Sequence, residues 1–117
     1  MKVLVQGTLN FGDYQVFMRA MGVALSSMHP KDKHFEVYSV GPHKVNDFAS
    51  GFSNLTENSL KRRGVKISFH KIPISVAEDK INRFDYVAFF SSPNESRWSR
   101  LAHMADEQGI ELGIFRF

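Results

Sequence analysis

The 117 residues include no cysteine, and this absence excludes several kinds of chemistry. Without thiols the chain can form no disulfide bond, no thiolate metal site and no cysteine nucleophile. No segment approaches the roughly 18 consecutive apolar residues that a membrane-spanning helix needs. The start of the chain, MKVLVQ, is too short for a signal peptide. We therefore expect a cytoplasmic protein that makes no membrane contact.

The motifs of metal-dependent and serine-dependent enzymes are also missing. Five histidines are present, but none forms an H-x-x-x-H or H-E-x-x-H pair, so we predict no metal site. Ser91 and Ser92 lie outside any G-x-S-x-G motif, which argues against a hydrolase triad. We predict no cofactor.

The excess of positive charge is small and is spread along the chain. Lys and Arg number 15 against 12 Asp and Glu, which gives a net charge of +3. A nucleic-acid-binding domain usually gathers its cations, so this dispersal argues against nucleic acid as a partner. One tight cluster, Lys61-Arg62-Arg63, precedes Gly64 at a predicted helix end. Cations there complement the helix dipole, an explanation that we prefer to a phosphate-binding patch.

The chain has the length and the pattern of a single α/β domain over residues 1–117. A hydrophobic fraction of 43% fits one core. Apolar or alternating runs predict five strands, at 2–6, 34–40, 65–70, 84–90 and 110–116. Periodic apolar residues predict helices at 14–28 and 44–62 and a short one near 76–81. A last helix is predicted with Ser92 as N-cap, Pro93 at its first position and its end near Gly109.

Alternation of strands with helices predicts a parallel sheet that is covered on both faces. Right-handed crossovers leave few topologies, and we predict a Rossmann-like, doubly wound sheet in strand order 3-2-1-4-5. In such sheets, ligands bind at the carboxyl ends of the strands where the order reverses. Here that point lies between the first and the fourth strand.

The loops after the first, second and fourth strands would meet there, and they carry small polar and cationic side chains. Together with two helix N-termini, these side chains suit a phosphate or another small anion. The candidate ligand-binding residues are Gly7, Thr8, Asn10, Phe11 and Asp13, then Gly41, His43 and Lys44, and finally Ser91, Ser92, Asn94 and Arg97.

Three of these residues have competing structural explanations. Asp13 is a plausible N-cap for the helix that follows it. Phe11 could stack on a base, but a hydrophobic staple for that helix is the preferred explanation. His43 could bind phosphate or act as a base, but an ordinary surface-loop histidine is the preferred explanation.

Two further features point to protein partners. Phe115 and Phe117 close the last strand, and an unprotected edge there could pair with a second copy in a homo-oligomer. Near Trp98 the chain carries a group of arginines that could form an interaction surface. These are Arg97, Arg100 and Arg116.

Long stretches resemble SLOG-type Rossmann-like domains, a superfamily that includes lysine-decarboxylase-like phosphoribohydrolases and small SLOG proteins of prokaryotes and phages. The first stretch is MKVLVQGTLNFGDYQVFMRAMGVAL, and the second is VYSVGPHKVNDFASGFSNLTENSLKRRGV. The fourth strand with MADEQGIELGIF resembles the closing helix and strand of the family. The resemblance covers nearly the whole chain in element order. It implies a nucleotide-derived ligand and a small protein of the kind that phages encode.

The chain departs from the enzymatic members of that family at the residues that matter for catalysis. Those members resemble one another in a Pro-Gly-Gly-x-Gly-Thr loop after the fourth strand, followed by a catalytic Glu. Here the corresponding stretch, SSPNESRW, has no glycine, and an apolar residue near Leu101 fills the place of the Glu. Glu95 is the one carboxylate nearby, and we assign it to the first turn of the helix rather than to catalysis. The turn after the second strand also has Pro42-His43 where a second glycine is usual.

The sequence therefore favours a non-catalytic domain that binds a nucleotide-derived or other small anionic ligand. The alternative is a small phage-type protein that binds and modulates a host protein through its surface. A nucleotide glycosidase or transferase that uses Glu95 or Asp13 ranks last.

Overall fold

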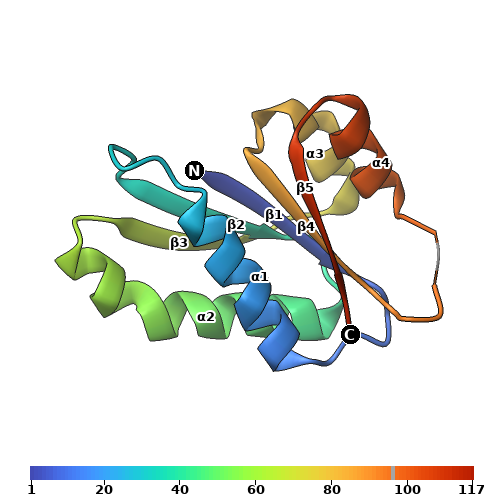
Figure 1. Cartoon of the computed structure of the whole chain (residues 1–117), viewed down its shortest axis with the longest axis horizontal. Coiled ribbons are helices and arrows are strands. Elements are labelled where there is room, and N and C mark those ends of the chain that lie inside the picture. Colours follow the sequence, from blue (N-terminus) through green and yellow to red (C-terminus); the bar gives the residue numbers. More distant parts are fainter. Residues whose placement is uncertain (96) are drawn as a thin grey trace.

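The structure is a computed structural model that describes residues 1–95 and 97–117 (Figure 1). Strands and helices alternate along the chain. In order they are β1 (Lys2–Gly7), α1 (Tyr14–Ser26), β2 (His34–Ser39), α2 (His43–Arg62), β3 (Lys66–Lys71), α3 (Ile74–Asp79), the 3-10 turn η1 (Ile81–Arg83), β4 (Tyr86–Ser91), α4 (Arg100–Glu107) and β5 (Glu111–Arg116).

The five strands form one parallel sheet in the order β3-β2-β1-β4-β5, as the sequence predicted. The inner strand β4 is buried along its whole length, because helices cover both of its faces. The strand β2 alternates between buried and more exposed residues, since only one of its faces is fully covered. This arrangement is a Rossmann-like α/β fold.

Two apolar clusters hold the helices against the sheet. The larger cluster joins α1 and α2 to one face through residues such as Phe17, Phe52 and Val37. The smaller cluster joins α3 and α4 to the other face through Leu4, Val87 and Leu101 among others. Figure 1 shows α3 and α4 gathered over the β4–β5 side, whereas α2 runs along the β3 side of the molecule.

Most predicted helix ends are confirmed by local backbone chemistry. Asp13 caps α1, since its Oδ1 accepts a hydrogen bond from the backbone N–H of Val16 at 3.1 Å. After α2, Gly64 adopts a φ of 74°, the left-handed conformation that ends a helix most easily with glycine. Lys61 and Arg62 lie in the last turn of α2, where the sequence placed them.

The predicted start of the last helix is wrong. The helix α4 begins at Arg100, and its N-cap is Ser99, whose Oγ accepts from the N–H of Ala102 at 3.2 Å. Residues 92–95 and 97–99 form a loop instead. The physical reason is packing: the apolar face of α4 starts only at Leu101, so nothing anchors an earlier helical turn to the sheet.

Among the residues that the structure describes, no helix combines the length and the apolar composition that crossing a membrane would require. The last strand β5 lies at an edge of the sheet, as predicted. Phe115 and Phe117 are both partly buried against the larger apolar cluster.

Candidate functional site

The three predicted ligand loops meet at the carboxyl edge of the sheet. Gly7 at the end of β1 pairs in register with Phe90 of β4. The N–H of Thr8 then donates to the carbonyl oxygen of Phe90 at 3.0 Å. On the other side, the N–H of Gly7 donates to the carbonyl oxygen of Gly41 at 3.0 Å. The loops after β1, β2 and β4 are thus neighbours, which is the geometry that strand order 3-2-1-4-5 demands.

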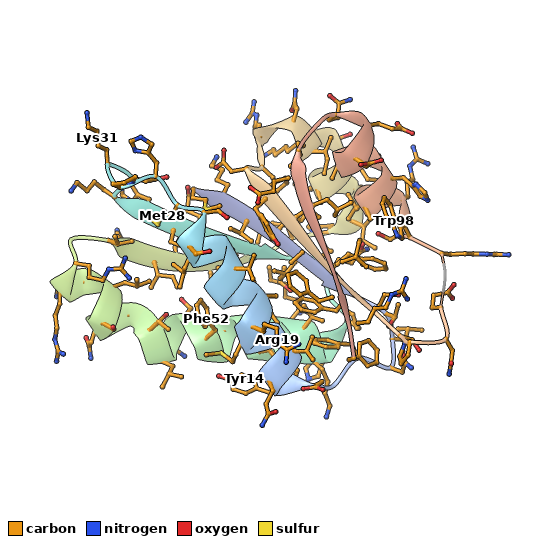
Figure 2. The ribbon with its side chains drawn as sticks, in the orientation of Figure 1. Tyr14, Arg19, Met28, Lys31, Phe52 and Trp98 are labelled. Carbon is orange, nitrogen blue, oxygen red and sulfur yellow. The ribbon has the colours of Figure 1, made fainter. Side chains whose placement is uncertain are left out.

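An open hollow of about 380 Å³ lies between the β1 loop and the segment that leads into α4. Its floor comes from the sheet, through Gln6 and Phe89, and its walls come from both loops. The remaining lining residues are Gly7, Thr8, Leu9, Glu95, Arg97, Trp98 and Ser99. Figure 2 shows Trp98 next to the start of α4. Of the predicted ligand residues, Gly7, Thr8 and Arg97 therefore line the hollow.

Polar groups at the base of the hollow are already bonded to one another. The Ser99 hydroxyl donates to Oε1 of Gln6 at 2.5 Å, while its oxygen caps α4. The Glu95 carboxylate accepts from the N–H of Arg97 at 2.9 Å. Sequence reasoning did not select Trp98 or Ser99 as ligand contacts, because the helix was expected to begin earlier, and it placed Gln6 within the first strand.

Phe11 belongs to the core. Its side chain is only 1% exposed, and its ring stacks on Phe90 with centroids 4.5 Å apart. Phe117 and Phe48 also surround it, at 5.0 and 5.8 Å. With its ring enclosed in this way, Phe11 has no face free for a base in this structure. It ties the β1 loop to the sheet and to α2.

The rest of the β1 loop makes local bonds. The Thr8 hydroxyl donates to Oδ1 of Asn10 at 3.0 Å, and Asn10 is exposed. Because the Asp13 carboxylate caps α1, negative charge already sits at the positive end of that helix. An anion would meet repulsion there, so α1 is the less suitable of the helix ends at this edge.

The residues after β2 lie on the opposite side of the β1 loop from the hollow. Gly41 has a φ of 95° and accepts the bond from Gly7. His43 is the first residue of α2, and its Nε2 lies 3.3 Å from Oδ2 of Asp47 one turn later. The Lys44 side chain runs beside Gly12, with Nζ 3.8 Å from where a Cβ would stand on that glycine.

The loop after β4 is not helical, and hydrogen bonds between side chains and backbone groups hold it in place. The buried Ser91 hydroxyl donates to the carbonyl oxygen of Glu95 at 3.2 Å. Nη1 of Arg116 donates to the same oxygen at 2.9 Å and to the carbonyl oxygen of Ser92 at 3.3 Å. The Ser92 hydroxyl accepts from the N–H of Asn94 at 3.3 Å. Ser96, within the predicted ligand loop 91–97, lies outside the described residues.

Glu95 is therefore not in a first helical turn, contrary to the expectation from sequence. It lies in the loop five residues before α4 begins. Leu101, near the place of the catalytic Glu in the enzymes that the chain resembles, is 1% exposed and packs in the smaller apolar cluster.

Within residues 1–95 and 97–117, no group of three or more His, Asp or Glu side chains is arranged to hold a metal ion. No protein-family model matches the chain, and no curated protein or solved structure is significantly similar to it. The Rossmann-like architecture therefore stands on the sheet order and the alternating helices alone.

Proposed function

We propose that this protein is a non-catalytic SLOG-type domain that binds a small anionic, nucleotide-derived ligand in the hollow between the β1 loop and α4. The observation that carries the proposal is the convergence of a cation, an aromatic ring and a helix N-terminus. Arg97 and Trp98 line the hollow beside Ser99, the N-cap of α4. A phosphate would meet the guanidinium and the helix end, and a base would stack on the indole.

The same contacts argue against catalysis at this place. Glu95, the carboxylate of the hollow, accepts a backbone hydrogen bond from its own loop. That bond turns Oε1 toward its own loop, and the place of the catalytic Glu in the enzymes that the chain resembles falls near the buried Leu101. The loop also has no glycine between Ser91 and Ser99 to bring the backbone close to a phosphate.

Thermal unfolding in the presence of nucleoside mono- and diphosphates and ADP-ribose tests this function. A ligand at about 100 times its Kd should add roughly 2.7 kcal/mol to the free energy of unfolding. Arg97→Gln and Trp98→Ala should remove most of the shift in Tm. Arg19→Gln removes the same charge from the exposed side of α1 and should leave the shift intact. A library in which no nucleotide raises Tm would refute the proposal.

A base-release assay separates binding from catalysis. We expect no free base from nucleoside monophosphates incubated with the protein. Release that disappears in Glu95→Gln would instead establish a glycosidase and overturn the non-catalytic assignment.

One observation favours a second function, binding to another protein. Leu9 lines the rim of the hollow and is 93% exposed. Trp98 lines the same hollow, and two large apolar side chains that share one surface suit a protein contact. A partner retained by the wild-type protein and lost with Leu9→Ser would support this function, whereas no Leu9-dependent partner would remove it.

A further inference from the structure

The amino edge of the sheet, where the parallel strands begin, gathers cations that are far apart in the sequence. Lys31 and Lys33 lie in the loop before β2, and Lys66 begins β3. The N–H of Lys66 donates to the carbonyl oxygen of Lys33 at 2.8 Å, which joins these segments. The end of α2 leads directly into β3 and adds three more cations. We call the whole set the basic end: Lys31, Lys33, Lys61, Arg62, Arg63 and Lys66.

The cations of the basic end outnumber the carboxylates beside them. Asp32 lies between Lys31 and Lys33 and pairs with the N-terminal ammonium, while Glu57 lines the same surface pocket as Lys61 and Lys66. All six side chains are exposed. The ion pairs found among the described residues involve Asp32, Asp47 and Glu78, and none includes a cation of the basic end. With Asp32 and Glu57 counted there, the basic end has six cations and two carboxylates, and the rest of the chain has nine Lys and Arg against ten Asp and Glu. The excess of positive charge is thus concentrated at one end, which makes the basic end a steering surface for anions.

The helix dipole explains only part of this cluster. Lys61 and Arg62 lie in the last turn of α2, where cations are favourable. Lys31, Lys33 and Lys66 belong to a loop and to a strand, so no helix end accounts for their position. In Figure 2, Lys31 projects from its loop at the same end of the molecule as the end of α2.

A polar strip of the sheet continues from the basic end. Lys66, Ser68 and His70 alternate along β3 and therefore share the face of the sheet that α2 does not cover. His70 pairs in register with Tyr38 of β2, and their rings stack with centroids 4.7 Å apart. The Ser68 hydroxyl and Nε2 of His70 are hydrogen-bonded at 3.0 Å, which orients the imidazole.

The two rings of this strip are not equally accessible. Tyr38 packs against Phe84, and its hydroxyl donates to the Glu36 carboxylate at 3.1 Å. This burial raises the pKa of Tyr38. His70 is exposed at the outer strand of the sheet. An incoming ring would therefore stack on His70, with Tyr38 as its support.

We propose that the basic end and the strip of Lys66, Ser68 and His70 bind single-stranded nucleic acid. The cations would hold phosphates, and His70 would stack on a base. An open sheet face with the exposed His70 ring admits unpaired bases, whereas a duplex hides its bases from such a surface. The side chains of the strip are aromatic or hydrogen-bonding, a chemistry that fits bases better than lipid tails.

Binding of a labelled single strand of about twelve nucleotides, followed by fluorescence anisotropy, tests the proposal. The affinity should fall steeply as salt rises, because bound phosphates release counterions. The triple variant Lys61→Gln, Arg62→Gln, Arg63→Gln should weaken binding at least ten-fold and reduce the salt slope. The matched control Arg19→Gln, Lys44→Gln, Arg100→Gln removes the same charge elsewhere and should bind like the wild type.

His70→Ala tests the strip separately, because its side chain is exposed and its loss should not unfold the protein. We expect single-strand affinity to fall about five-fold or more. Equal binding of duplex and single strand, or no effect of His70→Ala, would overturn the role of the strip. Equal losses in the two triple variants would overturn the basic end as the binding surface. Binding to anionic vesicles without binding to oligonucleotides would overturn the proposal and identify a membrane surface as the ligand of the basic end.

These outcomes are independent of the proposed function in the hollow. Arg97→Gln should leave oligonucleotide binding unchanged, and the triple variant of the basic end should leave nucleotide-induced shifts of Tm unchanged.

Discussion

The two edges of the sheet use their polar groups in opposite ways. At the carboxyl edge, many of them bond to one another: Asp13 caps α1, Ser99 caps α4, and Gly7 donates to Gly41. At the amino edge, the cations of the basic end form no ion pair among the described residues. The fold class directs attention to the first edge, while the larger group of cations outside these ion pairs lies at the second.

This difference shows that a recurrent fold architecture and the availability of side chains for binding are separate properties of a site. Strand order dictates where loops converge, and it did so here. Whether the converged loops are free to bind depends on what their side chains already contact. The following variants test how much the residues of the carboxyl edge contribute to the free energy of unfolding. They also test whether the cations of the amino edge contribute to it.

Phe11→Ala should give the largest effect. This side chain is enclosed by Phe90, Phe48 and Phe117, so its truncation leaves a cavity under the β1 loop. We expect a loss of about 3–5 kcal/mol in the free energy of unfolding, measured by chemical denaturation. Leu9→Ala is the control, since Leu9 is 93% exposed, and should change stability by less than about 0.5 kcal/mol. Similar losses in both variants would mean that Phe11 is not a core residue.

Gly7→Ala should give an intermediate effect. A Cβ at Gly7 would stand 2.8 Å from Cγ2 of Val45 and 3.3 Å from the Phe11 ring, closer than packing allows. We expect a loss of about 1–3 kcal/mol. Gly22→Ala lies on the exposed side of α1, where an added Cβ meets nothing within 4 Å. It should gain about 0.5–1 kcal/mol, because alanine favours the helix. A Gly7→Ala protein as stable as the wild type would show that the carboxyl edge can accommodate an added methyl group.

Lys61→Gln should give the smallest effect. Its charge complements the end of α2, so its loss should cost about 0.3–1 kcal/mol at low salt. Lys33→Gln lies outside any helix and should leave the free energy of unfolding unchanged. The difference between the two variants should shrink in concentrated salt, which screens the dipole term. A large loss in Lys33→Gln would give the basic end a structural role.

Much of the fold could be predicted because its signals are local. The apolar run of β4 and the periodic face of α2 each identify one element without reference to the rest of the chain. The start of α4 could not be predicted in this way. Ser92-Pro93 has the chemistry of a helix start, but the apolar face that stabilises α4 begins at Leu101.

The meeting of the loops was predicted, but most of the residues that line the hollow were not, and ligand binding there stays a prediction. Gly7, Thr8 and Arg97 line the hollow, as their loops implied. Phe11 was selected because it follows a strand, yet it is buried against Phe90, a residue almost eighty positions away. Trp98 and Ser99 were missed as contacts because the loop that presents them was assigned to a helix.

By itself, the sequence determined the element types, the strand order and the approximate place of the crevice, because periodicity and turn chemistry act over a few residues. Only the tertiary structure decided which side chains are neighbours. The cations at 31, 33, 61–63 and 66 look dispersed along the chain. They become one surface because parallel strands joined by crossover helices bring every strand start to the same edge.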